Sequence, residues 1–162
     1  MENQTLFEHL VRSLAAKGAT VATAESCTGG GIAKAITDIP GSSAVLLGGV
    51  VTYTNEVKIA LLGVDPALIA RESEVSYACA KAMAQGARER LGSTVAVSAT
   101  GYAGPGGGTE KDPVGTVYLG IATEKAVISE RFCAPLGSSR EEVREAAIRR
   151  AAELILDTVD CL

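Results

Sequence analysis

One histidine, His9, and no tryptophan occur among the 162 residues, and aromatic side chains make up only 4%. Histidine is the commonest metal ligand and a frequent general base near neutral pH. His9 lies on a segment of helical apolar periodicity, far from any cysteine or acidic cluster, so we expect no transition-metal site. Any catalysis must then rest on Ser, Thr, Lys, Tyr or Cys side chains and on backbone amides.

Cysteine is also sparse, and the four residues Cys27, Cys79, Cys133 and Cys161 form no Cys-x-x-Cys pair. A chain of this length does not need disulfides to fold. We therefore expect free, reduced thiols.

The chain has neither an excess of positive charge nor a long apolar run. Its formal net charge is −4 and its pI is about 5.1, and no Lys/Arg-rich stretch occurs. Such a chain has no cationic field for a phosphate backbone, so we expect no nucleic-acid partner. The polar first nine residues and the absence of any apolar run near the ~20 residues of a membrane span predict a cytoplasmic protein without a membrane partner.

Small and aliphatic residues are what the chain has in abundance. Hydrophobic residues make up 47% of the sequence, and 18 residues are glycine. This supplies ample core material for a single domain covering 1–162, with helices and strands in close approach.

Apolar periodicity and turn residues predict an alternation of helices and strands. In chain order we expect helix 5–17, strand 19–25, a helix that starts near Ile32 and ends before Pro40, strand 44–54, a short helix carrying Lys58, a helix opening at Asp65-Pro66, helix 76–91, strand 94–100, hairpin strands 115–123 and 126–134, and helix 139–159. Capping boxes are expected at Thr5-x-x-Glu8 and Ser139-x-x-Glu142. This order predicts an α/β fold, a three-layer α/β/α sandwich around a mixed sheet of about five strands with a hairpin on its C-terminal side.

Two glycine-rich segments are candidates for function. Residues 24–30, Ala-Glu-Ser-Cys-Thr-Gly-Gly, join a strand to a helix, where backbone amides favour a phosphate or an oxyanion. The structural alternative is a tight turn in which Ser26 or Thr28 caps the helix. Residues 101–113 form a long glycine-rich loop, and such loops in a compact domain are usually functional or mobile.

Lys58 is a candidate general base. It lies at the start of a predicted helix, whose dipole disfavours an ammonium and should lower the pKa of the lysine. The alternative is an ordinary exposed lysine. Pro-Gly-Ser-Ser (40–43) reads as a turn in which Ser43 has no evident activating base nearby in the sequence.

Together these segments resemble a known family. The motifs are Ala-Glu-Ser-Cys-Thr-Gly-Gly (24–30), Pro-Gly-Ser-Ser (40–43), Val-Thr-Tyr-Thr-Asn-Glu-Val-Lys (51–58), Gly-Tyr-Ala-Gly-Pro-Gly-Gly-Gly (101–108) and Pro-Val-Gly-Thr-Val (113–117). Five motifs in this order resemble the stand-alone form of the CinA C-terminal domain, the nicotinamide mononucleotide deamidases.

The resemblance implies an amidohydrolase of pyridine nucleotide salvage. The implied reaction converts nicotinamide mononucleotide to nicotinic acid mononucleotide and ammonia by a Ser/Lys dyad, without metal or cofactor. The positions that match the family's catalytic motif are Ser26, Ser43, Tyr53 and Lys58. The substrate-binding positions that we expect are Thr28, Gly29, Gly30, Thr100, Gly101, Gly104 and Arg140.

Two departures from the family pattern concern the pocket. Tyr102 stands where the family usually has an aliphatic residue, which would reshape the pocket. The spacing from Gly137 to Arg140 is one residue longer than in the family, so Arg144 is the substitute for Arg140 as the substrate-side arginine.

In the expected mechanism a neutral Lys58 takes the proton of Ser43, whose oxygen attacks the carboxamide. Tyr53 and Ser26 would relay protons or orient the reacting groups. The alternative nucleophiles are Ser26 and Cys27, the latter as a thiolate at a helix N-terminus. The alternative class is a non-catalytic nucleotide-binding or regulatory module linked to competence or DNA damage. In either class we expect a small-molecule nucleotide ligand and a homo-oligomer.

Overall fold

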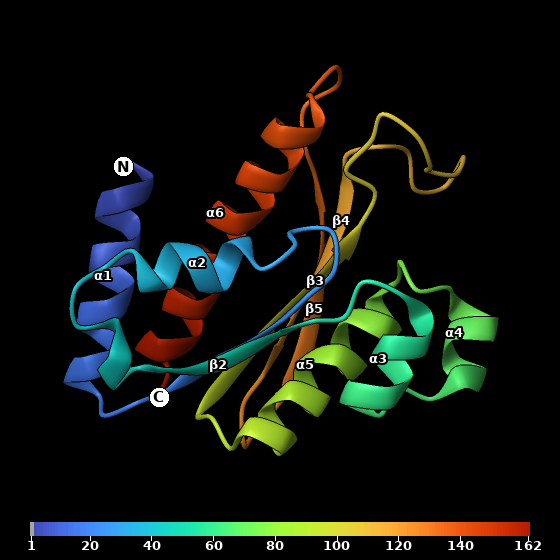
Figure 1. The fold of residues 1–162 in the computed structure, drawn as a ribbon. Coiled ribbons are helices and arrows are strands. Elements are labelled where there is room, and N and C mark those ends of the chain that lie inside the picture. Colours follow the sequence, from blue (N-terminus) through green and yellow to red (C-terminus); the bar gives the residue numbers. More distant parts are fainter. Residues whose placement is uncertain (1) are drawn as a thin grey trace.

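The computed structural model describes residues 2–162, and within these residues five strands form one mixed sheet (Figure 1). The strands are β1 (Val21–Glu25), β2 (Leu46–Val51), β3 (Val95–Gly101), β4 (Thr116–Ala122) and β5 (Val127–Cys133). Their order in the sheet is β2-β1-β3-β4-β5. The first three are parallel to one another, and β4 and β5 form an antiparallel hairpin next to β3.

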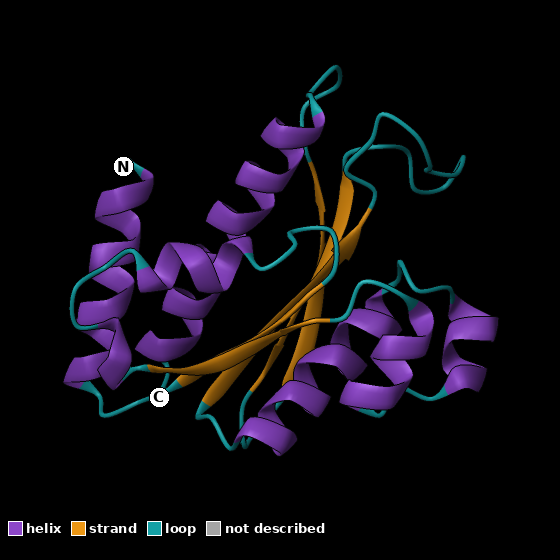
Figure 2. Cartoon of the chain, viewed as in Figure 1, coloured by secondary structure: helices purple, strands orange, loops and turns teal. Residues whose placement is uncertain are grey.

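Helices cover both faces of the sheet (Figure 2). On one face lie α1 (Asn3–Ala16), α2 (Gly31–Thr37) and α6 (Arg140–Asp160), and on the other lie α3 (Asn55–Leu62), α4 (Pro66–Glu72) and α5 (Tyr77–Leu91). The predicted three-layer α/β sandwich with a C-terminal-side hairpin is confirmed. Within the described residues, no helix combines the length and the hydrophobicity that a membrane crossing requires.

Small residues bring the α5 layer close to the sheet and to α3. A side chain at Gly120 of β4 would collide with the carbonyl oxygen of Ala80 in α5, and one at Gly86 would collide with that of Leu62 in α3. Close approach of backbones is a usual reason for glycine at such positions. These contacts seat α3, and therefore Lys58, firmly against the rest of the fold.

Helix starts follow the predicted caps in most places. Ser139 and Glu142 form the expected capping box, and the side chains of Thr54, Asp65 and Ser76 each accept a backbone N–H of the helix that they precede. The predicted box at Thr5 is wrong. The first helix begins at Asn3, two residues before Thr5, and its cap residue Glu2 makes no side-chain cap bond.

The second strand is shorter than the predicted 44–54. A 3₁₀ turn, η1 (Ser42–Ala44), occupies the residues before it, and Thr54 is taken up as the cap of α3. Consequently the chain leaves the sheet after Val51 and turns directly into the helix that carries Lys58.

Parallel pairing brings three carboxyl ends to one edge of the sheet. Ser26 follows β1, Thr52 follows β2, and Gly101 ends β3. In open α/β sheets, ligands bind at this edge.

Candidate active site

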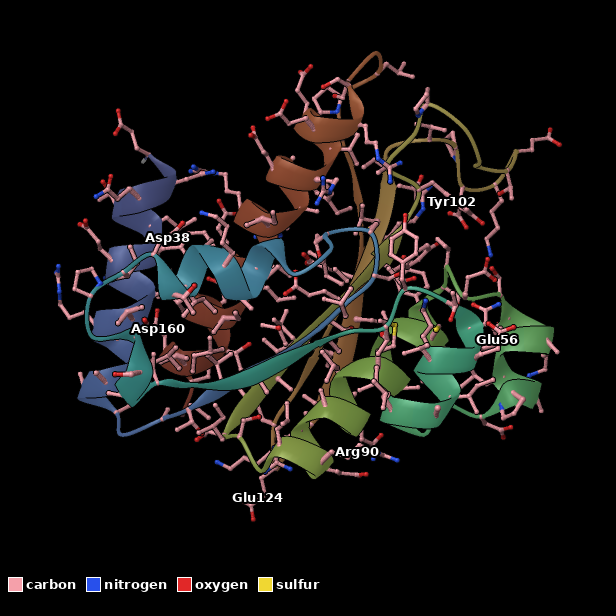
Figure 3. The ribbon with its side chains drawn as sticks, viewed as in Figure 1. Asp38, Glu56, Arg90, Tyr102, Glu124 and Asp160 are labelled. Atoms are coloured by element: carbon pink, nitrogen blue, oxygen red, sulfur yellow. The ribbon has the colours of Figure 1, made fainter. Side chains whose placement is uncertain are left out.

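A cleft of about 250 Å³ opens at the carboxyl ends of β1, β2 and β3. It is lined by Ser26, Cys27, Tyr53, Asn55, Lys58, Glu74, Val75, Thr100, Gly101, Tyr102, Ala103, Gly104, Gly106 and Arg140. Figure 3 shows Tyr102 on this side of the molecule, whereas Asp38, at the end of α2, lies on the opposite side. Seven of the predicted site residues are therefore gathered in one cleft: Ser26, Tyr53, Lys58, Thr100, Gly101, Gly104 and Arg140.

Ser26 is held rigidly at the end of β1. Its amide donates to the carbonyl of Ala99 on β3 at 2.9 Å, and its own carbonyl accepts from the amide of Gly29 at 3.0 Å in a tight turn. The residue is 8% exposed, at the floor of the cleft. The amide of Cys27, the next residue, donates to no carbonyl in the described part of the chain.

Lys58 reaches Ser26 from the first turn of α3. Its Nζ lies 3.2 Å from Ser26 Oγ, 2.9 Å from the carbonyl oxygen of Thr52 and 3.3 Å from that of Tyr53. The side chain is 1% exposed. Among residues 2–162, no carboxylate lies within ion-pair distance of this amine.

The hydrogen-bond geometry suits a neutral amine. An uncharged lysine has two N–H donors and one lone pair, and the two carbonyls of Thr52 and Tyr53 can accept both donors. The lone pair then faces the Ser26 hydroxyl, which donates to it. In the protonated form, Lys58 instead donates to Ser26.

Burial lowers the pKa of Lys58, because removing the ammonium from water penalises the charged form. Cys79, Glu74 and Cys27 act in the opposite direction and raise this pKa as anions, to a smaller extent. The sequence predicts a lowered pKa from the position of Lys58 at a helix start. The structure agrees that the pKa is lowered, but the main cause is desolvation. Deprotonation of Lys58 needs less alkaline conditions than that of an exposed lysine.

Arg140, from the start of α6, closes the mouth of the cleft. Its Nη1 donates to the carbonyl of Gly104 at 2.7 Å and its Nη2 to the hydroxyl of Tyr53 at 3.2 Å. The Tyr53 side chain is 58% exposed. A guanidinium has five N–H donors, so donors remain for an anionic group of a ligand. Between the two candidate arginines, the structure places Arg140 in the cleft.

The structure does not bring Ser43 to Lys58. Ser43 is exposed in η1 before β2, whereas Lys58 contacts Thr52 just after β2. Six strand residues separate the two ends of β2, which at ~3.3 Å per residue is about 20 Å. The expectation that Lys58 activates Ser43 is therefore wrong for residues of the same chain, and Ser26 is the hydroxyl at the amine.

The amides at the start of α2 are already occupied by a protein carboxylate. Glu25 is 1% exposed and accepts from the amides of Ile32 at 2.8 Å and Ala33 at 3.1 Å. It also accepts the hydroxyl of Thr28 at 2.7 Å and that of Thr23 at 3.1 Å. A phosphate at this helix start would meet the buried negative charge of Glu25. The prediction that these amides bind an anion of the ligand is therefore wrong.

Thr28, Gly29 and Gly30 consequently shape the turn and do not line the cleft. Gly29 and Gly30 have φ angles of 61° and 94°, which favour glycine. Arg144 donates to the carbonyls of Cys27 at 3.1 Å and Thr28 at 3.2 Å. This arginine therefore supports the turn from behind.

Cys27 lies in the cleft but is poorly suited to act as a nucleophile. Burial raises the pKa of its thiol to about 12. The thiolate is the reactive form, so Cys27 is almost wholly unreactive near neutral pH.

The glycine-rich loop is tied down at its outer half. Asp112 accepts from the Tyr118 hydroxyl at 2.8 Å and from Arg131 Nε at 3.0 Å. Arg131 also donates to the carbonyl of Lys111 at 3.1 Å. On the inner side, Thr100 donates to the carbonyl of Glu74 at 2.8 Å. The loop presents Gly101, Gly104 and Gly106 to the cleft on a fixed frame.

Sequence reasoning missed Glu25, Glu74 and Asp112 as parts of this site and its frame. Glu25 carried a usable signal, since it ends the buried strand 21–25, and a buried carboxylate must have hydrogen-bond donors. Asp112 and Glu74 carried none, because the fold alone brings Arg131 to the carboxylate of Asp112 and Thr100 to the carbonyl of Glu74. Within residues 2–162, no three His, Cys, Asp or Glu side chains gather as a metal ion would require.

Fold and cleft together define a three-layer α/β protein with a buried Ser–Lys pair at the carboxyl edge of its parallel strands. The model of the CinA C-terminal domain matches residues 3–159, and the chain belongs to this family.

Relatives and solved structures agree with this assignment. The chain is 44% identical over 156 residues to a CinA-like protein of Acidobacterium capsulatum, covering 95% of this chain and 37% of that protein. It superposes with a TM-score of 0.92 and 40% identity on the competence/damage inducible protein CihA of Agrobacterium tumefaciens, covering 98% and 95% of the two chains. A CinA superfamily protein of Klebsiella pneumoniae gives a TM-score of 0.95 at 31% identity, with 100% of each chain covered.

The curated relatives are longer proteins. The chain spans between 26% and 38% of the length of the CinA-like and competence-damage proteins that it matches. The solved structures, by contrast, match over nearly their whole length.

Proposed function

We propose that this protein is an amidohydrolase that converts nicotinamide mononucleotide to nicotinic acid mononucleotide and ammonia. The observation that carries the proposal is the buried pair of Lys58 Nζ and Ser26 Oγ, 3.2 Å apart in a cleft, with the remaining lysine donors directed at two carbonyls. The mononucleotide as substrate rests on the resemblance to the stand-alone deamidases of the family.

In the first step, Lys58 acts as general base and Ser26 as nucleophile. The neutral amine takes the hydroxyl proton as Oγ attacks the carboxamide carbon, which gives a tetrahedral intermediate and a Lys58 ammonium. The ammonium then donates its proton to the amide nitrogen, and the C–N bond breaks. Ammonia leaves, and an ester joins the nicotinoyl group to Ser26.

In the second step, water replaces the serine. Lys58, neutral again, takes a proton from a water molecule that attacks the ester carbon. The proton returns to Ser26 Oγ as the C–O bond breaks, and the acid product is released. One lysine therefore serves both half-reactions, and the atoms balance as amide plus water giving acid plus ammonia.

Two further groups complete the proposed chemistry. The amide of Cys27, directly after the nucleophile, donates to no backbone carbonyl of the described residues and is a donor for the oxyanion of the tetrahedral intermediate. Arg140, at the mouth of the cleft, supplies charge-assisted hydrogen bonds to the phosphate. Tyr53 positions Arg140 through its hydroxyl and Lys58 through its carbonyl.

An ammonia-release assay tests the proposal. Purified protein is incubated with nicotinamide mononucleotide, and with nicotinamide and nicotinamide riboside beside it. We expect release of ammonia from the mononucleotide, much less from the other two, and no release by Lys58→Arg, because a guanidinium cannot act as a base at working pH. Binding of the mononucleotide without ammonia release would favour the non-catalytic module instead.

A further inference from the structure

Glu74 and Tyr102 line the cleft but take no part in the proposed bond-breaking steps. Glu74, before α5, is half-buried and is the only carboxylate among the described residues that line the cleft. Its side chain is 3.4 Å from the Ser73 hydroxyl, and no cation of the described chain lies within ion-pair distance. A carboxylate left without a cationic partner beside a reactive centre calls for an explanation.

The backbone before Glu74 is held in a conformation that its residue type disfavours. Ser73 has φ 78°, and in residues 2–162 it is the only non-glycine residue with positive φ. Three contacts hold the segment: Val75 N to Ser73 Oγ at 3.2 Å, Ser76 Oγ to the Ser73 carbonyl at 2.8 Å, and Thr100 Oγ1 to the Glu74 carbonyl at 2.8 Å. Strained residues of this kind gather at functional sites.

Tyr102 lies beside this segment. Its side chain packs against the cluster of Val75, Ala80 and Tyr118, so it neighbours the residue that follows Glu74. Its amide donates to the Thr116 carbonyl at 2.9 Å, and its carbonyl accepts from Gly115 at 2.7 Å. The backbone of Tyr102 is therefore held in place, and its side chain, labelled in Figure 3, forms part of the wall of the cleft.

The charges of the cleft are separated. Glu74 provides a negative charge on the α5 side, and Arg140 provides a positive charge at the α6 side, with Lys58 at the floor. Carboxylates and aromatic rings are the protein groups that attract organic cations. We propose that Glu74 and Tyr102 form a subsite for the positively charged ring of the substrate, and that they select a pyridinium carboxamide over its uncharged analogue.

This inference rests on the proposed function and extends it to charge selectivity. A bound pyridinium also offsets the negative charge of Glu74, which otherwise favours the ammonium form of Lys58. Arrival of the cationic ring therefore promotes the neutral lysine that the reaction needs. An uncharged ring of the same shape lacks both effects.

The test compares oxidised and reduced nicotinamide mononucleotide, which share the carboxamide, ribose and phosphate but differ in ring charge. Dissociation constants are measured by calorimetry in a Ser26→Ala background, so that neither compound is consumed. We expect Glu74→Gln, which keeps the size of the side chain, to weaken binding of the oxidised form about five- to tenfold. Binding of the reduced form should change less than about twofold. Tyr102→Leu should likewise weaken binding of the oxidised form more than binding of the reduced form.

The matched control is Glu72→Gln, an exposed carboxylate on α4 two residues from Glu74 and outside the cleft. Glu72→Gln should leave both dissociation constants unchanged. The subsite would be refuted if Glu74→Gln weakened binding of both compounds equally, or of neither. Ammonia release with Ser26 intact separates the two proposals. A Glu74-dependent preference for the oxidised form without ammonia release would refute the hydrolase and keep the subsite, and failure of both compounds to bind would refute both.

Discussion

Replacing Lys58 by methionine should make the protein more stable than the wild type, by an amount that depends on pH. This dependence reports the lowered pKa of Lys58. The amine is 1% exposed and has no anionic partner among the described residues, so the folded state disfavours its protonated form. Its pKa is lower in the folded protein than the ~10.4 of an unfolded chain. Between these two values the unfolded state binds more protons, so the stability of the wild type rises with pH.

The size of the effect follows from linkage. Below the folded pKa, burial of the ammonium reduces the free energy of unfolding by about 1.36 kcal/mol for each unit by which the pKa is lowered. Above ~10.4 both states are neutral and this reduction is absent. Lys58→Met has no such ionisation, so its stability relative to wild type should be highest near neutral pH and should fall as the pH approaches 10.

Urea unfolding of both proteins at several pH values between 6 and 10 measures this difference. Subtracting the two curves removes the contribution of the other titrating groups, which both proteins share. The folded-state pKa of Lys58 obtained from this difference should match the pH at which the ammonia-release rate of the wild type rises. A difference that stays flat between pH 6 and 10 would refute the argument that burial shifts the ionisation of Lys58.

Two further substitutions and one labelling experiment test other parts of the site. Glu25→Gln should lower the free energy of unfolding in urea by about 2–3 kcal/mol, because one amide oxygen cannot replace a carboxylate that accepts four hydrogen bonds. Iodoacetamide at pH 8 should label the exposed Cys133 and leave Cys27 and the activity largely intact, as mass spectrometry and the ammonia assay would show. Arg140→Leu should raise the KM for the mononucleotide about tenfold or more, with little effect on the riboside.

Much of the fold could be predicted because its signals are local. The caps at Asp65, Ser76 and Ser139 and the glycine stops fix where helices begin and end within a few residues of chain. The Thr5 box failed although its pattern fits, because the polar and exposed residues Asn3 and Gln4 extend the helix by one half-turn before Thr5, and nothing in the apolar pattern, which starts at Leu6, indicates this extension.

The catalytic pairing was less accessible from the sequence. The motifs identified both serines and Lys58, but choosing between Ser26 and Ser43 requires knowing which ends of two parallel strands meet. Ser43 precedes β2 and Ser26 follows β1, and since these strands run in the same direction the two serines lie at opposite edges of the sheet. Sequence spacing carries no information on this point.

The anion site was misplaced for a different reason. Glycine-rich strand-to-helix turns favour anions in general, but here the anion at the start of α2 is the protein's own Glu25. Residues 24–30 contain this carboxylate, but the prediction did not consider that Glu25 folds back onto the amides of Ile32 and Ala33. The same carboxylate explains why the turn that carries Ser26 is rigid.

The central claim is that Ser26, activated by Lys58, is the nucleophile. The most direct measurement is ammonia release from nicotinamide mononucleotide by Ser26→Ala and by Ser43→Ala, each shown to be folded by circular dichroism. The account predicts that Ser26→Ala loses at least about a thousandfold in kcat, as expected for loss of a nucleophile, while Ser43→Ala keeps most of the wild-type rate. An active Ser26→Ala enzyme, or an inactive Ser43→Ala enzyme beside it, would contradict the assignment.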